Sequence, residues 1–207
     1  MLSEKSVRTF LDELASSAPA PGGGSAAALA AAIGAALVSM VANLTVGKKD
    51  YAHVQDDIQR ILKRSEELRH KCLELLEGDV AAYTEVSLAY KMPRDTEEQK
   101  AARSAAIQKA LKAATAVPMQ LAEACVEILN LCPESAEKGN VRAISDVGVG
   151  ALMAEAALRA AALNVLINLG SIKDESFVQQ SRARLNALLE GKAELKEKIL
   201  KDVEAKL

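Results

Sequence analysis

An aspartate and a tyrosine one helical turn apart are the residues of this sequence best placed to do chemistry. Asp79 follows a glycine and precedes three small apolar residues and Tyr83, whereas most other acidic residues have lysine or arginine nearby. Their i,i+4 spacing puts Asp79 and Tyr83 on one face of a helix. A carboxylate away from the charged surface is expected to have a hydrogen-bond or ion-pair partner or a function, and general acid–base catalysis is one such function. We therefore take both as candidate catalytic residues.

A second candidate site is the run Gly22-Gly23-Gly24-Ser25, which leads into the most apolar stretch of the chain, residues 26–46. Ser25 stands where a helix N-cap belongs, and the unpaired N–H groups of a helix start attract anions. The run lacks the Lys-Ser/Thr of a phosphate-binding P-loop. The alternative reading is a glycine-rich turn into a buried helix. Both remain open on these residues alone.

Composition limits the class of protein. Half of the 207 residues are apolar, only 2% are aromatic and tryptophan is absent, so the core must consist of Ala, Leu, Val and Ile. The formal net charge of -2 argues against nucleic acid as a partner, because binding phosphates needs a basic face. We expect one domain, residues 1–207.

Cysteine and histidine usage points to a reduced, metal-free interior. Cys72, Cys125 and Cys132 are odd in number and lack CxxC spacing, which predicts buried free thiols in a cytoplasmic protein. No export signal opens the chain. His53 and His70 lie among charged residues and are not at metal-binding spacing, so we expect no metal site.

Hydrophobic periodicity predicts an all-α fold, a multihelical bundle around buried alanine-rich helices. We expect helices over residues 2–17, 26–46, 51–91 (unbroken, or kinked at Gly78), 96–116, 118–131 and 147–169, with amphipathic helix again from residue 174. Prolines 118 and 133 are expected to separate elements, and Ser145-Asp146 to cap the second apolar helix. No alternating β pattern occurs.

The apolar run 26–46 is long enough to cross a bilayer, but we expect it to be a core helix. It is mostly alanine, which inserts poorly, and it carries Ser39, Asn43 and Thr45 before ending at Lys48-Lys49. A helix that is apolar on all sides fits the middle of a bundle. No membrane association is therefore predicted.

Several motifs, in order, resemble one enzyme family. They are Pro21-Gly22-Gly23-Gly24-Ser25-Ala26-Ala27-Ala28, Met40-Val41-Ala42-Asn43-Leu44-Thr45-Val46-Gly47-Lys48-Lys49, Asp79-x-x-Ala82-Tyr83, Tyr90-Lys91-Met92-Pro93, Gly139-Asn140, Ser145-Asp146 and Asn164-Val165-Leu166-Ile167-Asn168-Leu169. The set covers nearly the whole chain and is similar to the cyclodeaminase/cyclohydrolase family. That family includes bacterial methenyltetrahydrofolate cyclohydrolases and the C-terminal domain of formiminotransferase-cyclodeaminase. Ala20 stands where threonine is frequent in the family.

The resemblance implies a dimer-forming helical enzyme, a homodimer or higher homo-oligomer, that acts on a reduced folate, with Asp79 as the catalytic residue. The folate is the substrate, and no separate cofactor is expected. The candidate substrate-binding residues are Gly22, Gly23, Gly24, Ser25, Asn43, Lys48, Lys49, Asn140, Ser145 and Asp146. Lys48 and Lys49, with the glycine-rich helix start, suit the carboxylates of the folate tail. Asp146 suits the 2-amino and N3 donors of the pterin, or it is a helix cap.

Two activities and one non-catalytic reading follow. We expect hydrolysis of 5,10-methenyltetrahydrofolate to 10-formyltetrahydrofolate, because no formiminotransferase half accompanies the domain in this sequence. The alternative is the cyclodeaminase reaction, in which 5-formiminotetrahydrofolate closes to the methenyl form and releases ammonia. The further alternative is a helical binding or scaffold module whose glycines serve packing alone.

Overall fold

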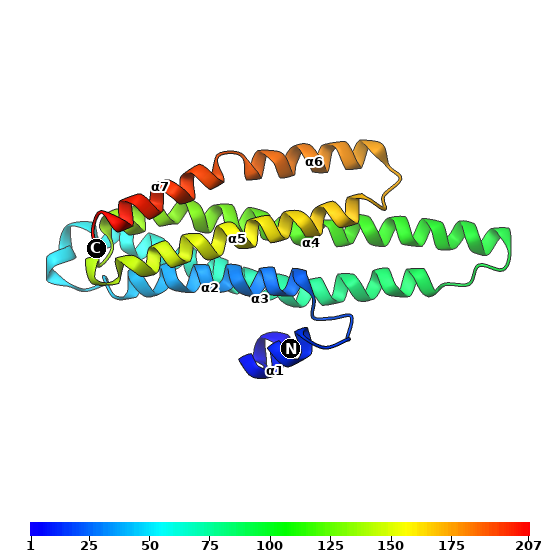
Figure 1. The fold of residues 1–207 in the computed structure, drawn as a ribbon, viewed down its shortest axis with the longest axis horizontal. Coiled ribbons are helices and arrows are strands. Elements are labelled where there is room, and N and C mark those ends of the chain that lie inside the picture. The colour runs from blue at the N-terminus through cyan, green and yellow to red at the C-terminus, as the bar shows by residue number, and fades with distance from the viewer.

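Helices make up all of the regular structure in the computed structural model, which describes residues 1–207 (Figure 1). In chain order they are η1 (Leu2–Glu4), α1 (Val7–Leu14), α2 (Gly23–Asn43), η2 (Lys49–Val54), α3 (Gln55–Lys91), α4 (Glu97–Lys138), η3 (Val141–Ala143), α5 (Ile144–Leu169), α6 (Glu175–Leu189) and α7 (Lys192–Glu204), where η marks a 3-10 helix. Helices α2 to α5 pack lengthwise, α6 and α7 lie outside them, and α1 stands off to one side (Figure 1). The predicted all-α class is confirmed.

The two alanine-rich helices, α2 and α5, pack directly against each other. A Cβ atom at Gly34 would lie 3.0 Å from the carbonyl oxygen of Gly150, and one at Gly150 would lie 3.2 Å from that of Gly34. The two backbones can come this close because neither glycine has a side chain. The pair runs antiparallel, since Asn140 just before α5 bonds to Thr45 just after α2. The start of α2 therefore lies beside the C-terminal half of α5.

Helices α3 and α4 form a long hairpin that extends beyond the others at one end (Figure 1). The predicted breaks at Pro118 and Pro133 are wrong, because both prolines lie inside the continuous 42-residue α4. An interior proline removes a backbone hydrogen bond and costs about 3 kcal/mol. Packing of α4 against α3 and α5 outweighs that loss. Of the two alternatives for α3, the helix unbroken at Gly78 is the one observed.

Four helix starts differ from prediction. One is α3, which begins at Gln55 because the predicted start at residue 51 lies in η2. Helix α2 begins at Gly23, with Gly22 as N-cap and no side-chain cap, so Ser25 is not the cap. Helix α5 begins at Ile144, two residues before Asp146, because Asn140 already caps the preceding η3 by accepting from the N–H of Arg142 at 3.1 Å. The predicted helix over residues 2–17 is divided into η1 and α1, because Ser6 caps α1.

The three cysteines are free thiols in the core, as predicted. Burial raises the pKa of Cys72 and of Cys132 to about 12. Burial likewise raises the pKa of Cys125 well above its ordinary value. All three thiols therefore stay protonated at neutral pH, and they act as small apolar side chains.

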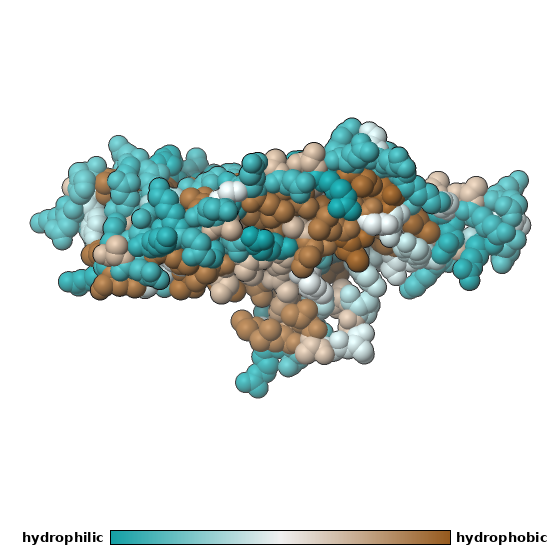
Figure 2. Space-filling view, turned by 45° about the horizontal axis from the view of Figure 1, so that its top comes forward, coloured by the Kyte–Doolittle hydropathy of each residue, from teal (hydrophilic) through white to brown (hydrophobic).

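Helix α2 and the segment Val141–Leu169 are long and apolar enough to cross a membrane by length and composition. Their most apolar windows are 61% and 44% buried inside the bundle, respectively, which is the pattern of core helices with one open side. That open side is rich in apolar side chains, as the brown areas along the middle of the bundle indicate (Figure 2). It also carries the exposed Arg159 of α5, which lies between Leu152 and Leu163 along the helix. We call it the α2/α5 face; its exposed side chains are Ile33, Met40, Leu44, Val149, Leu152, Met153, Leu163 and Ile167.

Candidate active site

Asp79 lies on α3 against the start of α2. The hydroxyl of Ser25 donates a hydrogen bond to Oδ2 of Asp79 at 2.8 Å, across 54 residues of sequence. Ser25 is fully buried and Asp79 is partly buried, so the serine side of this bond is shielded from solvent. The other carboxylate oxygen, Oδ1, accepts no hydrogen bond within the protein. One oxygen thus fixes the carboxylate, and the other is available for chemistry.

Gly24 is what lets the carboxylate reach this position. A Cβ atom at Gly24 would lie 2.1 Å from Oδ1 and 2.5 Å from Cγ of Asp79, well inside any allowed contact. A Cβ at the neighbouring Gly23 would meet nothing within 4 Å. The first residues of α2 also carry N–H groups without helical partners, where the positive end of the helix dipole lies. The glycine-rich start therefore holds Asp79 beside several free backbone donors.

Two adjoining hollows open around Asp79 and share Tyr83 and Asn164. One, of about 220 Å³, lies under the loop from Pro19 to Gly24. The other, of about 330 Å³, is lined by Asp79, Ala82, Tyr83 and Val86 of α3, Ala114 and Pro118 of α4, and Asn164, Ile167 and Asn168 of α5. Tyr83 is 45% exposed, so its phenol connects the hollow to solvent. The predicted pairing of Asp79 and Tyr83 on one face is observed.

The structure gathers only part of the predicted site. Asp79, Tyr83 and Gly22 to Ser25 come together, and we call this region the Asp79 end of the bundle. The opposite end of α2 and α5 holds Asn43, Lys48, Lys49, Asn140, Ser145 and Asp146, and we call it the Asn140 end. The 21 residues of α2 separate the two ends by about 30 Å, at 1.5 Å per residue. Within one chain, the second group does not reach Asp79.

At the Asn140 end, the side chains of Asn140 and Thr45 donate hydrogen bonds to backbone carbonyls. The side chain of Asn140 donates to the carbonyl of Leu44 at 2.9 Å, and its backbone N–H donates to the hydroxyl of Thr45 at 2.9 Å. Thr45 in turn donates to the carbonyl of Val41 at 2.7 Å. These bonds join the loops that close α2 and open α5. Asn140 thus has a structural role, whereas Lys48, Lys49 and Ser145 are exposed.

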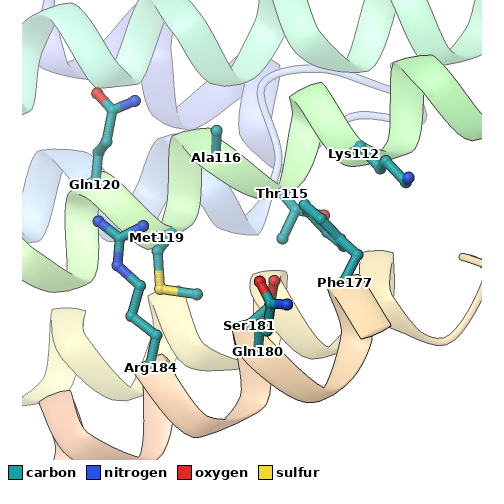
Figure 3. A pocket seen from close by; sticks show the side chains of 9 residues that line it. All are labelled: Lys112, Thr115, Ala116, Met119, Gln120, Phe177, Gln180, Ser181 and Arg184. Atoms are coloured by element: carbon teal, nitrogen blue, oxygen red, sulfur yellow. The ribbon is translucent and has the colours of Figure 1, made fainter. Parts of the chain in front are cut away.

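A separate cavity of about 340 Å³ lies between α4 and α6 (Figure 3). Its two cationic side chains are already paired, Lys112 with Asp174 at 2.6 Å and Arg184 with Glu123. Lys112 also lies over the ring of Phe177, 5.3 Å from its centre. With both cations paired and no Asp, Glu, His or Cys among its lining residues, this cavity lacks the features of an active site. Nor do three or more His, Cys, Asp or Glu side chains gather anywhere as metal ligands.

Asn164 and Asn168 are lining residues that the sequence analysis did not assign to the site. The sequence signal was present, because two asparagines at i,i+4 spacing interrupt an otherwise apolar helix. Such asparagines often satisfy buried backbone groups. Asn164 does bond to the carbonyl of Ala160 at 2.8 Å, but it also lines both hollows beside Asp79.

The fold is all-helical, and it fixes a carboxylate at a glycine-rich helix start. The sequence profile of the family described as formiminotransferase-cyclodeaminase matches residues 6–187. The chain belongs to this family, as its motifs indicated.

Two relatives and one solved structure show which members of this family the chain resembles. The chain is 47% identical over 207 residues to methenyltetrahydrofolate cyclohydrolase of Methylorubrum extorquens, and the match covers 100% of both chains. It is 39% identical over 189 residues to formimidoyltransferase-cyclodeaminase of Sus scrofa, of which it spans 35%. Its fold matches formiminotetrahydrofolate cyclodeaminase of Thermotoga maritima with a TM-score of 0.82 at 32% identity, over 100% of this chain and 98% of the other.

Proposed function

We propose that this protein is an enzyme that hydrolyses 5,10-methenyltetrahydrofolate to 10-formyltetrahydrofolate. The observation that carries the proposal is the carboxylate of Asp79, fixed by Ser25 through one oxygen and open to a hollow through the other. The full-length similarity to a methenyltetrahydrofolate cyclohydrolase supports this choice of reaction. Folate is the substrate in this scheme, and the steps below use no separate cofactor.

In the proposed reaction, Asp79 acts as the general base. The substrate carries a positive amidinium group in which one carbon joins N5 and N10, and the charge of Asp79 stabilises it. Water adds to that carbon, a C–O bond forms, and Oδ1 of Asp79 takes one water proton, which leaves a neutral adduct. General-base assistance of this kind contributes about 10²–10⁴-fold.

The adduct then opens. The C–N5 bond breaks, N5 takes the proton held by Asp79, and the hydroxyl proton of the adduct leaves to solvent, so that a formyl group remains on N10. One proton is released overall. Tyr83 is the proposed carrier of that proton, because its phenol lines the hollow and is 45% exposed. The free N–H groups of Gly23 and Gly24 are proposed to hold the adduct oxygen as it loses its proton and the adduct opens.

The cyclodeaminase reaction is the second candidate, favoured by the structural match to a formiminotetrahydrofolate cyclodeaminase. There, N10 attacks the formimino carbon on N5 and ammonia leaves, so the same tetrahedral centre forms beside the same carboxylate. We rank it second because the two reported relatives described as cyclodeaminases are 39% and 32% identical, against 47% for the cyclohydrolase.

A homodimer formed through the α2/α5 face is part of the proposal. Large exposed apolar areas mark interaction sites, and a two-fold pair would bury the same face on both copies. Leu163 and Ile167 are 69% and 73% exposed, far more than an isolated core helix would leave in water. Buried free thiols suit a reducing compartment, and we place the dimer in the cytoplasm.

An antiparallel pair would also give the Asn140 end a role. It would set the partner copy's Lys48 and Lys49 near Asp79, where they could receive the carboxylates of the folate tail. Mixing two inactive variants, Asp79→Asn and Lys48→Glu/Lys49→Glu, tests this arrangement. Half of the mixed dimers would be heterodimers with one intact site, so about a quarter of wild-type activity should return. No recovery, or a monomer in light scattering, would contradict it.

The activity itself is tested by following the absorbance of the methenyl chromophore. With methenyltetrahydrofolate, the absorbance should fall faster than the spontaneous rate in buffer. With formiminotetrahydrofolate, it should rise with release of ammonia only if the cyclodeaminase reaction holds. If folate binds but neither rate exceeds the spontaneous rate, the protein is a folate-binding module and not an enzyme. If folate does not bind either, the protein is a helical scaffold.

A further inference from the structure

Two carboxamide side chains form a polar edge in the larger hollow beside Asp79. Asn164 and Asn168 stand one turn apart on α5, and both line the hollow that Asp79 and Tyr83 of α3 also line. Its remaining lining residues are apolar: Ala82, Val86, Ala114, Pro118 and Ile167. Both asparagines are only partly buried. Polar groups concentrated on one side of an apolar hollow fix the orientation of a ligand.

The orientation of the Asn164 amide follows from its bond to the backbone. Its Nδ2 donates to the carbonyl oxygen of Ala160 at 2.8 Å. A carbonyl oxygen can only accept, so the NH₂ group must face Ala160 and Oδ1 must point elsewhere. Oδ1 has no hydrogen-bond partner within the protein. Asn164 therefore offers an acceptor to a ligand in the hollow. Asn168 makes no side-chain hydrogen bond in the protein, and its whole amide is available.

We infer that Asn164 and Asn168 recognise the pterin ring of the substrate by accepting hydrogen bonds from its 2-amino and N3–H donors. This inference rests on the proposed function, because it takes a folate as the ligand. On the sequence alone, Asp146 is a candidate either for that task or for a helix cap. Asp146 lies about 27 Å from Asn164 along α5, at 1.5 Å per residue, so within one chain it cannot serve a ring held beside Asp79.

A ligand that lacks one donor gives the sharpest test. Binding of tetrahydrofolate and of its 2-desamino analogue is measured for the wild type, Asn164→Leu, Asn168→Leu and the exposed control Asn130→Leu. The wild type and the control should prefer tetrahydrofolate by about tenfold, the worth of one hydrogen bond. At least one of the Asn164 and Asn168 variants should lose that preference, because the donor would have no acceptor. Asp146→Asn should retain it.

Kinetics and melting separate recognition from folding. In the variants, KM for methenyltetrahydrofolate should rise about tenfold with kcat nearly unchanged, since the ring contact is the same before and during reaction. The melting temperature should not move, because the carbonyl of Ala160 keeps its helical hydrogen bond. If Asn164→Leu does not fold, Asn164→Ser removes the same reach with a smaller side chain.

The outcomes are distinct from failure of the proposed function. Retention of the preference in both asparagine variants, or its loss in Asp146→Asn, would overturn the inference even if the enzyme turns over normally. A wild type that binds tetrahydrofolate with the expected preference but hydrolyses nothing would end the proposed function and leave this inference standing. Failure to bind tetrahydrofolate would end both.

Discussion

The two ends of the α2 and α5 pair use polar side chains differently. At the Asn140 end, Asn140 and Thr45 bond to backbone groups, so each polar atom completes the fold. At the Asp79 end, the buried hydroxyl of Ser25 bonds to another side chain, and that carboxylate keeps one oxygen free. Backbone bonding marks a structural role, whereas a fixed and incompletely bonded charge beside a hollow marks a functional one. The predictions below test that distinction.

Among the residues around Asp79, the largest effect is expected from Gly24→Ala. Its Cβ would lie 2.1 Å from Oδ1 of Asp79, so the carboxylate must move, and we expect kcat/KM to fall by about 10² or more. Gly23→Ala is the matched control, because its Cβ meets nothing within 4 Å and should change activity little. Turnover and melting of both variants should be compared. Equal losses in the two would show that the glycines serve only the turn.

Ser25→Ala should have an intermediate effect. The substitution removes the hydrogen bond to Oδ2 of Asp79 and leaves the carboxylate free to rotate, so kcat should fall about tenfold. Ser39→Ala is the control on the same helix, because Ser39 is also buried but bonds to Ser65 at 2.7 Å. It should lower stability without changing kcat. Similar kinetics for the two variants would remove the distinction between them.

Asn140→Ala should lower stability and leave the kinetics almost unchanged. The carbonyl of Leu44 would lose a part-buried hydrogen bond, worth about 0.5–1.5 kcal/mol. Thermal melting and turnover of the same preparation separate the two effects. A raised KM at an unchanged melting temperature would instead make Asn140 a substrate-binding residue, as the sequence analysis expected.

A small, acid-specific effect is expected from Glu66, which lies in the middle of α3, away from both ends. A hydrogen bond from Arg69, helped by Ser39, lowers the pKa of Glu66 from 4.5 to about 2. A lowered folded-state pKa stabilises the protein above pH 4.5, and this contribution is lost as pH falls toward about 2. Glu66→Gln should therefore flatten the acid part of the melting-temperature profile. An unchanged profile would show that the pair contributes nothing, as many exposed ion pairs do.

Local patterns predicted the elements of the fold better than their boundaries. The all-α class, the burial of the three cysteines and the shared face of Asp79 and Tyr83 follow from composition and helical spacing. The continuity of α4 through Pro118 and Pro133 did not follow, because neighbouring helices outweigh a local proline preference.

The candidate site was predicted in part, for a related reason. Ser25 looked like a helix cap in sequence, but its partner is Asp79, 54 residues away, and local rules contain no information about such a pair. The motifs of the Asn140 end were grouped with the site because they occur in the same family pattern, although one chain places them about 30 Å away along α2.

The most direct measurement is kcat for Asp79→Asn with methenyltetrahydrofolate, alongside binding of tetrahydrofolate and thermal melting. Asparagine keeps the size and the bond from Ser25 but cannot accept the proton, so we predict a fall in kcat of about 10² or more. Folate affinity and melting temperature should stay close to those of the wild type. Near-normal turnover in a folded but less stable Asp79→Asn protein would contradict a catalytic role and show that Asp79 is a structural residue.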